Sequence, residues 1–329
     1  MGSVVTDARM LARALADPAS VVGLDAERWT ALLATARAEQ LIGTLAIRLD
    51  GLPMPAAVKA ILADARAAAE HGRRAALWEA EMARRALAVI DCPIVLLKGT
   101  AFVAAGLSPG QGRSIGDLDI LVPRASLDAV ESVLLAAGWE WVKPDPYDDV
   151  YYRRWMHELP PLIHRERDRM IDVHHTILPL TARITPDADA LIEDSVPLEN
   201  GLRILSPTGM IVHAAAHLFA DGDLAGGMRN VWDIRCLLEE FGTDGLDAAA
   251  RRHGLHHEVA RSVRLVDALF GEGEARGIDR AYIRRVTARD GWGRPTRPVT
   301  RLAFYIRSHW LRMPPAMLSR HLWTKWRKG

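Results

Sequence analysis

The sequence predicts an α+β protein in which a small mixed β-sheet is flanked by helical regions. Residues 6–90 and the chain from Ser206 onward are rich in helix-forming residues, with apolar positions three and four apart. Between them, short β-branched runs alternate with helical segments, as is typical of a small mixed sheet. Three parts are therefore expected: residues 1–90, 91–205 and 206–329.

The composition is that of an ordinary globular protein. Of the 329 residues, 49% are hydrophobic and 25% are charged, a balance typical of soluble domains. No run of 18 apolar residues occurs, so no transmembrane helix is expected, and the first residues lack the apolar stretch of a signal peptide. Cys92 and Cys236 are isolated, which excludes a disulfide framework and predicts a cytoplasmic location.

The middle part begins with a change of pattern at Pro93. Before it, a long helix is expected from Ala56 to Ile90, because Ala, Arg and Glu favour helices. Residues 93–97 are short, apolar and β-branched, which predicts a buried strand. A helix over residues 101–105 and a loop rich in Gly, Ser and Pro follow. The Asp-Leu-Asp-Ile-Leu-Val segment at 117–122 then predicts a second strand.

The remaining elements of the sheet follow this strand. Residues 126–137 have helical periodicity and end at Gly138, a typical residue after a helix. Residues 139–142 are expected to form a strand. Residues 150–177 are expected to form a hairpin with residues 162–163 and 170–174 as its arms.

Three aspartates of the middle part form a candidate metal site. Asp117 and Asp119 lie two residues apart on an expected strand and point to one face, and Asp172 lies on a later strand. Neighbouring carboxylates repel each other, so loss of one is expected to stabilise the metal-free protein. Mg²⁺ prefers such oxygen ligands together with substrate phosphates. By itself, Asp-x-Asp is more common on a solvated edge strand.

The segment before these aspartates predicts a phosphate site. The first strand ends at Lys98-Gly99-Thr100 and opens into a helix. Glycine permits the close approach of a phosphate, and the N–H groups of a helix start and the Thr hydroxyl can bind its oxygens. A phosphate cradle, metal sites and a carboxylate near the attacking hydroxyl are the parts that nucleotidyl transfer requires.

The order of these motifs resembles the DNA polymerase β-like nucleotidyltransferase superfamily. The closest likeness is to a bacterial branch of uncharacterised nucleotidyltransferases, and it is strongest over residues 94–177. Four segments carry it, in this order: Lys98-Gly99-Thr100, Arg113, residues 117–122 and residues 171–174. The helices after Ser206 match more loosely, through Arg229 and Asp233.

The resemblance implies a role for each carboxylate. Asp117 and Asp119 would hold two Mg²⁺ ions that bridge the phosphates of a nucleoside triphosphate such as ATP. Asp172 would complete one metal site and help to deprotonate the acceptor hydroxyl. Gly99 and Thr100 would contact the β- and γ-phosphates.

Three further residues are candidates for nucleotide binding. Lys98 and Arg113 have no firm role in the superfamily, but each can neutralise triphosphate charge. His174 shares the strand face of Asp172 and can contact phosphate or acceptor, or can simply pack against a neighbour. The sequence departs from the superfamily in two places: Thr100 replaces the usual Ser, and the spacer of 16 residues before Asp117 is long.

Two patterns in the last part allow two interpretations each. His213, His217 and Asp221 are four residues apart, which suits a transition metal or a packed helix face. Arg229 and Asp233 have the same spacing, which suits a simple ion pair or a link between the last part and the sheet.

The end of the chain is strongly basic. Residues 276–329 contain 14 Lys and Arg against two Asp, and Trp310, Trp323 and Trp326 lie among them. Such a segment suits an anionic partner, either nucleic acid or a membrane surface. Alternatively, it docks on the acidic body with its Trp side chains buried. We expect docking, because three exposed Trp side chains would form a costly apolar patch.

The resemblance implies an enzyme that moves a nucleoside monophosphate from a nucleoside triphosphate to an acceptor hydroxyl and releases pyrophosphate. The acceptor would be a small molecule, a peptide or tRNA. Two alternatives are a toxin-type enzyme that modifies tRNA or protein, and a catalytically idle binding scaffold with the same fold.

Overall fold

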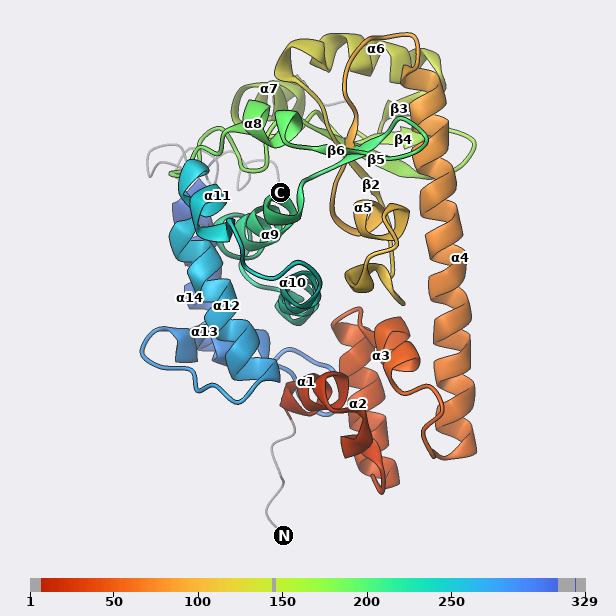
Figure 1. The fold of residues 1–329 in the computed structure, drawn as a ribbon, viewed down its shortest axis with the longest axis vertical. Coiled ribbons are helices and arrows are strands. Elements are labelled where there is room, and N and C mark those ends of the chain that lie inside the picture. Colours follow the sequence, from red (N-terminus) through yellow and green to blue (C-terminus); the bar gives the residue numbers. More distant parts are fainter. Residues whose placement is uncertain (1–6, 144–145, 313–322, 324–329) are drawn as a thin grey trace.

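The computed structural model describes residues 7–143, 146–312 and 323. These residues form a mixed seven-stranded sheet with the order β3-β4-β5-β2-β1-β7-β6, surrounded and extended by helices (Figure 1). The predicted α+β fold is confirmed. Among the described residues, no helix combines the length and apolar character needed to cross a membrane.

The strands are short. Their bounds are β1 Val95–Leu96, β2 Leu118–Leu121, β3 Trp139–Trp141, β4 Leu162–His164, β5 Met170–His174, β6 Val196–Pro197 and β7 Arg203–Ile204. The α-helices are α1 Arg9–Ala16, α2 Ala26–Ala38, α3 Ile42–Arg48, α4 Ala56–Leu87, α5 Lys98–Ala104, α6 Leu127–Ala136, α7 Pro146–Trp155, α8 Ala188–Glu193, α9 Pro207–Ala216, α10 Gly227–Phe241, α11 Leu246–Arg252, α12 His256–Phe270, α13 Asp279–Val286 and α14 Pro298–Arg312.

The centre of the sheet combines parallel and antiparallel pairs. β2 pairs antiparallel with β1 and parallel with β5. β4 and β5 pair antiparallel, as expected for a hairpin. The hairpin prediction is wrong for residues 150–155, which belong to α7. The ion pair between Asp149 and Arg153, one helical turn apart at 2.7 Å, and the contact of Arg153 with Glu131 on α6 at 2.9 Å, stabilise this helix.

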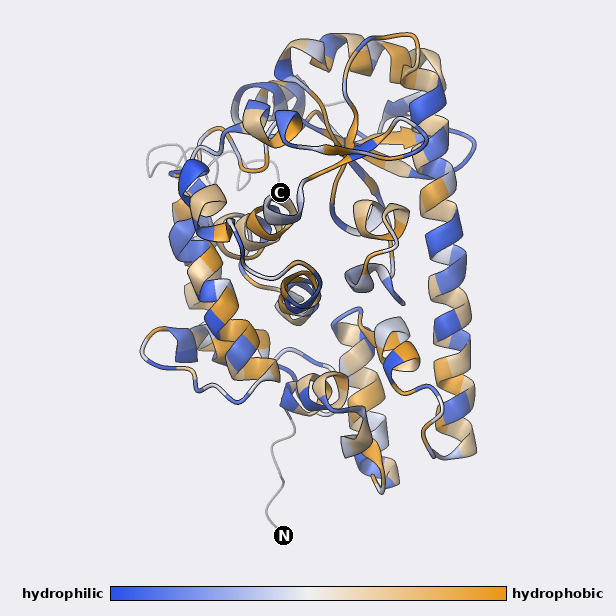
Figure 2. Cartoon of the chain, viewed as in Figure 1, coloured by the Kyte–Doolittle hydropathy of each residue, from blue (hydrophilic) through white to orange (hydrophobic). Residues whose placement is uncertain are grey.

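The long helix α4 begins at Ala56 as expected and ends at Leu87, three residues before the expected end. It runs along one edge of the molecule, from the N-terminal helices to α6 (Figure 1). Hydrophilic and hydrophobic bands alternate along it (Figure 2), because its inner face packs on other helices while its outer face meets solvent.

Two hydrophobic clusters hold the molecule together. The first surrounds the sheet and includes side chains of α4, α5, α6 and α9. The second joins α1, α2 and α3 to α10, α12 and α13. The N-terminal and C-terminal helices therefore pack against each other, although the sheet separates them in the sequence. The boundaries of the three expected parts stay a prediction.

The C-terminal helix α14 docks only on one side. Phe304 and Ser308 are buried, whereas Trp310 is 49% exposed and Trp323 is 59% exposed. The expectation of buried Trp side chains is therefore wrong for these two residues. The Trp310 ring instead lies 4.4 Å from the Arg183 guanidinium. Trp326 and residues 313–322 lie outside the described residues.

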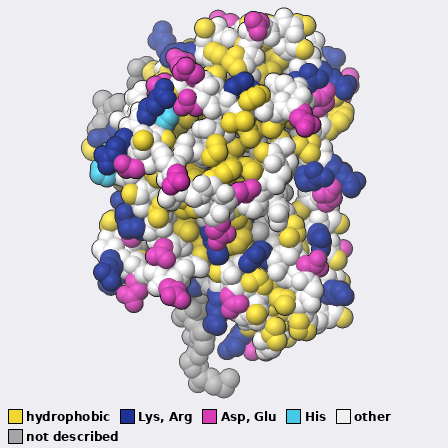
Figure 3. Space-filling view, viewed as in Figure 1, with side chains coloured by type: hydrophobic (Ala, Val, Ile, Leu, Met, Phe, Trp, Pro, Cys, Tyr) yellow, Lys and Arg dark blue, Asp and Glu magenta, His cyan; other side chains and the backbone are white. Residues whose placement is uncertain are grey.

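Charged side chains of both signs are interspersed on the face shown in Figure 3, with hydrophobic side chains near its centre. No single sign of charge dominates this face. The basic excess of residues 276–329 is therefore not seen as a basic patch on this face.

Candidate active site

Three carboxylates meet at the centre of the sheet. Asp119 on β2 and Asp172 on β5 are direct partners in the parallel pairing, and Asp117 immediately precedes β2. One carboxylate oxygen from each of the three lies within 4.8 Å of the others. The sequence prediction that these side chains converge is therefore confirmed, and the cluster has the oxygen ligands that Mg²⁺ prefers.

The Asp119 carboxylate is buried, but two neighbouring side chains compensate for its loss of contact with water. Its Oδ1 accepts from Lys98 Nζ at 2.6 Å and lies 2.9 Å from His174 Nε2. Burial alone would raise the pKa of Asp119, but the positive Lys98 and the hydrogen bond from His174 hold this pKa well below its usual range. Asp119 is therefore ionised at neutral pH.

Asp172 has the opposite environment. Burial, together with the negative charges of Glu158 and Asp119, raises the pKa of Asp172 to about 7. Its Oδ1 is buried and finds no hydrogen-bond partner within the described part of the chain. An incompletely satisfied carboxylate beside two others is the arrangement that a divalent cation would stabilise. The three residues therefore fit a Mg²⁺ site.

The predicted phosphate segment lies beside these carboxylates. Strand β1 runs antiparallel next to β2, and the N–H of Leu97, which follows β1, donates to the Asp119 carbonyl at 3.0 Å. A Cβ atom on Gly99 would lie 2.6 Å from Arg113 Nε. Only glycine therefore lets the Arg113 side chain cross this backbone.

An open cleft exposes part of this site. Its lining includes Lys98, Gly99, Arg113, Asp117 and Asp119, and it encloses about 620 Å³, a typical size for a ligand site. Residues in or beside the N-terminal and C-terminal helices also line it, among them Glu39, Gln40, Gly226, Arg229, Asn230 and Arg289.

Two of the predicted nucleotide-binding residues are buried away from the cleft lining. Thr100 is 1% exposed, and its hydroxyl has no hydrogen-bond partner among residues 7–143 and 146–312. His174 is also buried, with Nε2 facing Asp119 and Nδ1 facing Glu158. Their contact with a nucleotide stays a prediction.

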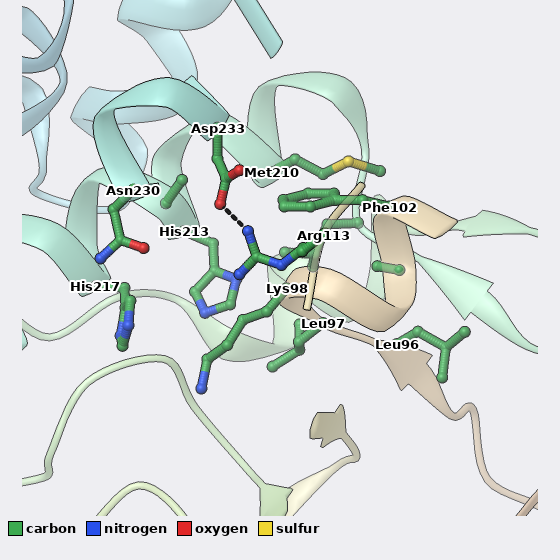
Figure 4. Close-up of a pocket in the computed structure, with 13 residues that line it drawn as sticks. Leu96, Leu97, Lys98, Phe102, Arg113, Met210, His213, His217, Asn230 and Asp233 are labelled. Carbon is green, nitrogen blue, oxygen red and sulfur yellow. Dashed lines mark hydrogen bonds and ion pairs between the residues drawn. The ribbon is translucent and has the colours of Figure 1, made fainter. Parts of the chain in front are cut away.

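Arg229 and Asp233 form more than a local helical pair. Arg229 contacts Asp233 at 2.8 Å and also donates to Thr44 Oγ1 and to the Pro109 carbonyl, each at 2.7 Å. Asp233 in turn accepts from Arg113, as the dashed line in Figure 4 shows. This buried chain of contacts connects the N-terminal helices, α10 and the cleft.

The side chain of Asp221 lies outside the described part of the structure, so the candidate metal pattern of His213, His217 and Asp221 stays a prediction. Helix α9 ends at Ala216, and a π-helical turn over His217–Asp221 follows. His213 and His217 both line a small pocket beside Lys98 and Asn230 (Figure 4).

Two residues near the carboxylates were not identified from the sequence. Glu158 pairs with His174 through an isolated bridge and raises the pKa of Asp172, but no spacing pattern marks it. Glu39 lines the cleft and binds Arg289 at 2.7 Å. These two residues are 250 positions apart, so their contact has no local sequence signal.

The fold and the carboxylate cluster define a protein suited to metal-assisted phosphate chemistry. Comparison with known families identifies the class more closely: the model of the uncharacterised nucleotidyltransferase family matches residues 25–271. The chain belongs to this family, and the match includes all three aspartates and the Lys98-Gly99-Thr100 segment. No curated protein matches the chain.

Proposed function

We propose that this protein transfers a nucleoside monophosphate from a nucleoside triphosphate to an acceptor hydroxyl, with Mg²⁺ bound by Asp117, Asp119 and Asp172. The observation that carries the proposal is the convergence of these carboxylates within 4.8 Å beside a cleft that is lined by Lys98 and Arg113. Family membership supports nucleotidyl transfer in general.

In the proposed reaction, the acceptor oxygen bonds to the α-phosphorus and the bond to pyrophosphate breaks. Asp172 is the residue proposed to help deprotonate the acceptor hydroxyl, because it lies directly opposite Asp119 in the strand pairing and belongs to the proposed metal group. Lys98 and Arg113 would neutralise the negative charge of the triphosphate. When bound, Mg²⁺ would supply further neutralisation and polarise the phosphate oxygens.

Gly99 is proposed to leave room for the triphosphate beside Arg113, which Asp233 holds in place. Thr100 would need to become accessible before its hydroxyl could contact a phosphate, because it is buried. For His174, the contacts with Asp119 and Glu158 favour a role in positioning the Asp119 carboxylate over direct contact with substrate.

We also propose an anionic partner for the C-terminal segment. The exposed Trp310 and the absence of any Asp or Glu from residues 291–329 support this proposal. Such a partner is compatible with a small-molecule, peptide or tRNA acceptor, so it does not decide among them. The intact set of carboxylates argues against an idle scaffold.

The test is release of pyrophosphate. The full chain is incubated with each α-³²P-labelled nucleoside triphosphate, Mg²⁺ and separate pools of small metabolites, peptides and tRNA. We expect label to move to one acceptor pool with one equivalent of pyrophosphate released. The Asp117→Asn variant is the control, because Asp117 is exposed and its loss should leave the fold intact. Transfer that persists in this variant or in excess chelator would overturn the proposal.

A further inference from the structure

A second group of possible metal ligands lies behind the carboxylates of the cleft. It consists of His157, Glu158 and His174, whose ligand atoms lie within 4.8 Å of one another. Glu158 Oε2 is 3.4 Å from His174 Nδ1 and 3.7 Å from His157 Nε2. Both histidines are buried, and their rings face each other with centroids 5.2 Å apart.

The hydrogen bonding of His174 leaves one nitrogen without a partner. Nε2 lies 2.9 Å from the Asp119 carboxylate, so Nε2 is the nitrogen that donates to this oxygen. Nδ1 is buried and has no hydrogen bond in the described residues. It faces Glu158 Oε2 at 3.4 Å, so a possible nitrogen ligand and a possible oxygen ligand point towards each other.

The separations fit a metal ion better than a direct hydrogen bond. A typical N–H···O hydrogen bond is about 2.7–3.2 Å long, shorter than the 3.4 Å observed between Nδ1 and Glu158. For a tetrahedral ion with bonds of about 2.0–2.1 Å, neighbouring ligand atoms lie roughly 3.3–3.4 Å apart. The two Glu158 contacts are close to this value.

We propose that His157, Glu158 and His174 bind a divalent transition-metal ion, of which Zn²⁺ is the best match. Two imidazoles and one carboxylate are ligands that suit Zn²⁺, whereas Mg²⁺ prefers oxygen ligands alone. The side chain of Glu158 is 16% exposed, which gives the ion access from solvent. This site is separate from the proposed Mg²⁺ site, and it does not depend on the proposed function.

The ion would also support Asp119. A metal-bound histidine usually donates its other ring N–H to a carboxylate, which fixes the tautomer and the orientation of the ring. Here His174 would bind the ion through Nδ1 and donate Nε2–H to Asp119. The second ion would therefore position a carboxylate of the cleft without touching the nucleotide.

The test is a titration of the full chain with Co²⁺, which replaces Zn²⁺ and absorbs visible light. The protein is purified without a histidine tag, stripped with a chelator and held in excess Mg²⁺ to fill oxygen-only sites. We expect one equivalent of Co²⁺ to give strong d–d absorption that Zn²⁺ abolishes. A parallel ¹⁵N spectrum of histidine should show a shift of two ring nitrogens on addition of Zn²⁺.

Two variants test the ligands, and two further variants are controls. His157→Phe and Glu158→Gln should weaken Co²⁺ binding by more than roughly 10–100-fold. That range is the usual effect of losing a residue that only hydrogen-bonds to a metal ligand. The matched control is His175→Phe, which removes a neighbouring buried histidine outside the cluster. Asp117→Asn should also keep the absorption, because Asp117 belongs to the other group.

If Co²⁺ absorption is unchanged in both His157→Phe and Glu158→Gln, the proposed ligand set is wrong. Loss of this absorption in Asp117→Asn would also contradict it. If a ligand variant fails to fold, the histidine ¹⁵N spectrum of the unmodified chain decides instead: no shift on addition of Zn²⁺ overturns the proposal. Neither readout requires catalysis. If no nucleotidyl transfer is found, the proposed transition-metal site is not affected. If no transition metal binds at this site, the proposed nucleotidyl transfer is not affected.

Discussion

Asp119 and Asp172 lie directly opposite each other on parallel strands, yet their environments shift their pKa values in opposite directions. Lys98 and His174 lower the pKa of Asp119 against the effect of burial. Asp172 lacks a comparable cation, and burial together with Glu158 raises its pKa to about 7. Two neighbouring carboxylates are thereby prepared for different tasks: one stays ionised, and the other can exchange a proton near neutral pH.

Replacement of Asp119 by Asn should destabilise the metal-free protein. The Asp-x-Asp pattern alone led us to expect the reverse, through relief of repulsion. The structure pairs Asp119 with Lys98 at 2.6 Å, so Asp119→Asn leaves a mostly buried ammonium group without its counter-charge. We expect a loss on the order of 2 kcal/mol in the free energy of unfolding, measured by urea denaturation in a chelator.

The matched variant is Asp117→Asn, because Asp117 is exposed. Its free energy of unfolding should stay within about 0.5 kcal/mol of the unmodified protein, while transfer is lost in both variants. Equal stability of the two variants would contradict the structural importance of the pair between Lys98 and Asp119.

Asp172 should make the metal-free protein less stable as the pH rises towards 7. Its pKa is about 7 in the folded protein and near 3.8 when unperturbed. Between these values the folded state holds a proton that the unfolded chain has released, so the free energy of unfolding falls as pH rises. The full penalty above pH 7 is on the order of 4 kcal/mol.

Asp172→Asn should remove this dependence. In a chelator, the variant should match the unmodified protein at about pH 4 and exceed it in stability at about pH 8. Urea midpoints at both pH values measure the difference. Added Mg²⁺ should stabilise only the unmodified protein, and more so at the higher pH, because binding requires ionised carboxylates. Parallel pH profiles for the two proteins would show that the pKa of Asp172 is not raised.

Gly99→Ala should weaken nucleotide binding through Arg113. The added Cβ would lie 2.6 Å from Arg113 Nε, so the guanidinium must move from its place beside Asp233. We expect roughly tenfold weaker binding of a non-cleavable ATP analogue, about 1.4 kcal/mol, measured by calorimetry with Mg²⁺. Gly116→Ala is the control, because no described atom lies within 4 Å of its added Cβ. Equal affinities in the two variants would remove Arg113 from the nucleotide site.

The sequence predicted those features of the site that follow from local periodicity. Alternation along a strand places Asp117 and Asp119 on one face, and the hairpin arm brings Asp172 beside them, as the pairing of β2 and β5 confirms. The α+β fold and helix α4 follow from equally local patterns. These signals extend over a few residues and survive in any tertiary context.

Contacts that depend on tertiary packing could not be predicted. Arg113 meets Asp233 across 120 positions, and Glu158 reaches the site through an isolated bridge rather than a strand. The π turn over His217–Asp221 was not predicted either, since apolar spacings of three and four predict a regular helix.

The exposed face of α14 provides the last prediction. Val299, Leu302, Ile306 and Trp310 follow one another at intervals of three and four residues and are all exposed, whereas Phe304 faces inward. Residues 291–329 contain nine Lys and Arg and no acidic residue. An apolar helix face within a basic segment is typical of a helix that lies on an anionic lipid surface.

Replacement of Leu302 and Ile306 together by Ser should abolish binding to vesicles that contain phosphatidylserine, because it removes the apolar contact of α14. The free energy of unfolding should change by no more than about 0.5 kcal/mol per residue, as is usual for exposed positions. Co-sedimentation and urea denaturation measure the two effects. Val89→Ser is the control, since Val89 is also exposed but lies just after α4, away from α14. A large loss of stability in the double variant would show that the chain itself covers this face, and binding to RNA but not to vesicles would identify nucleic acid as the anionic partner.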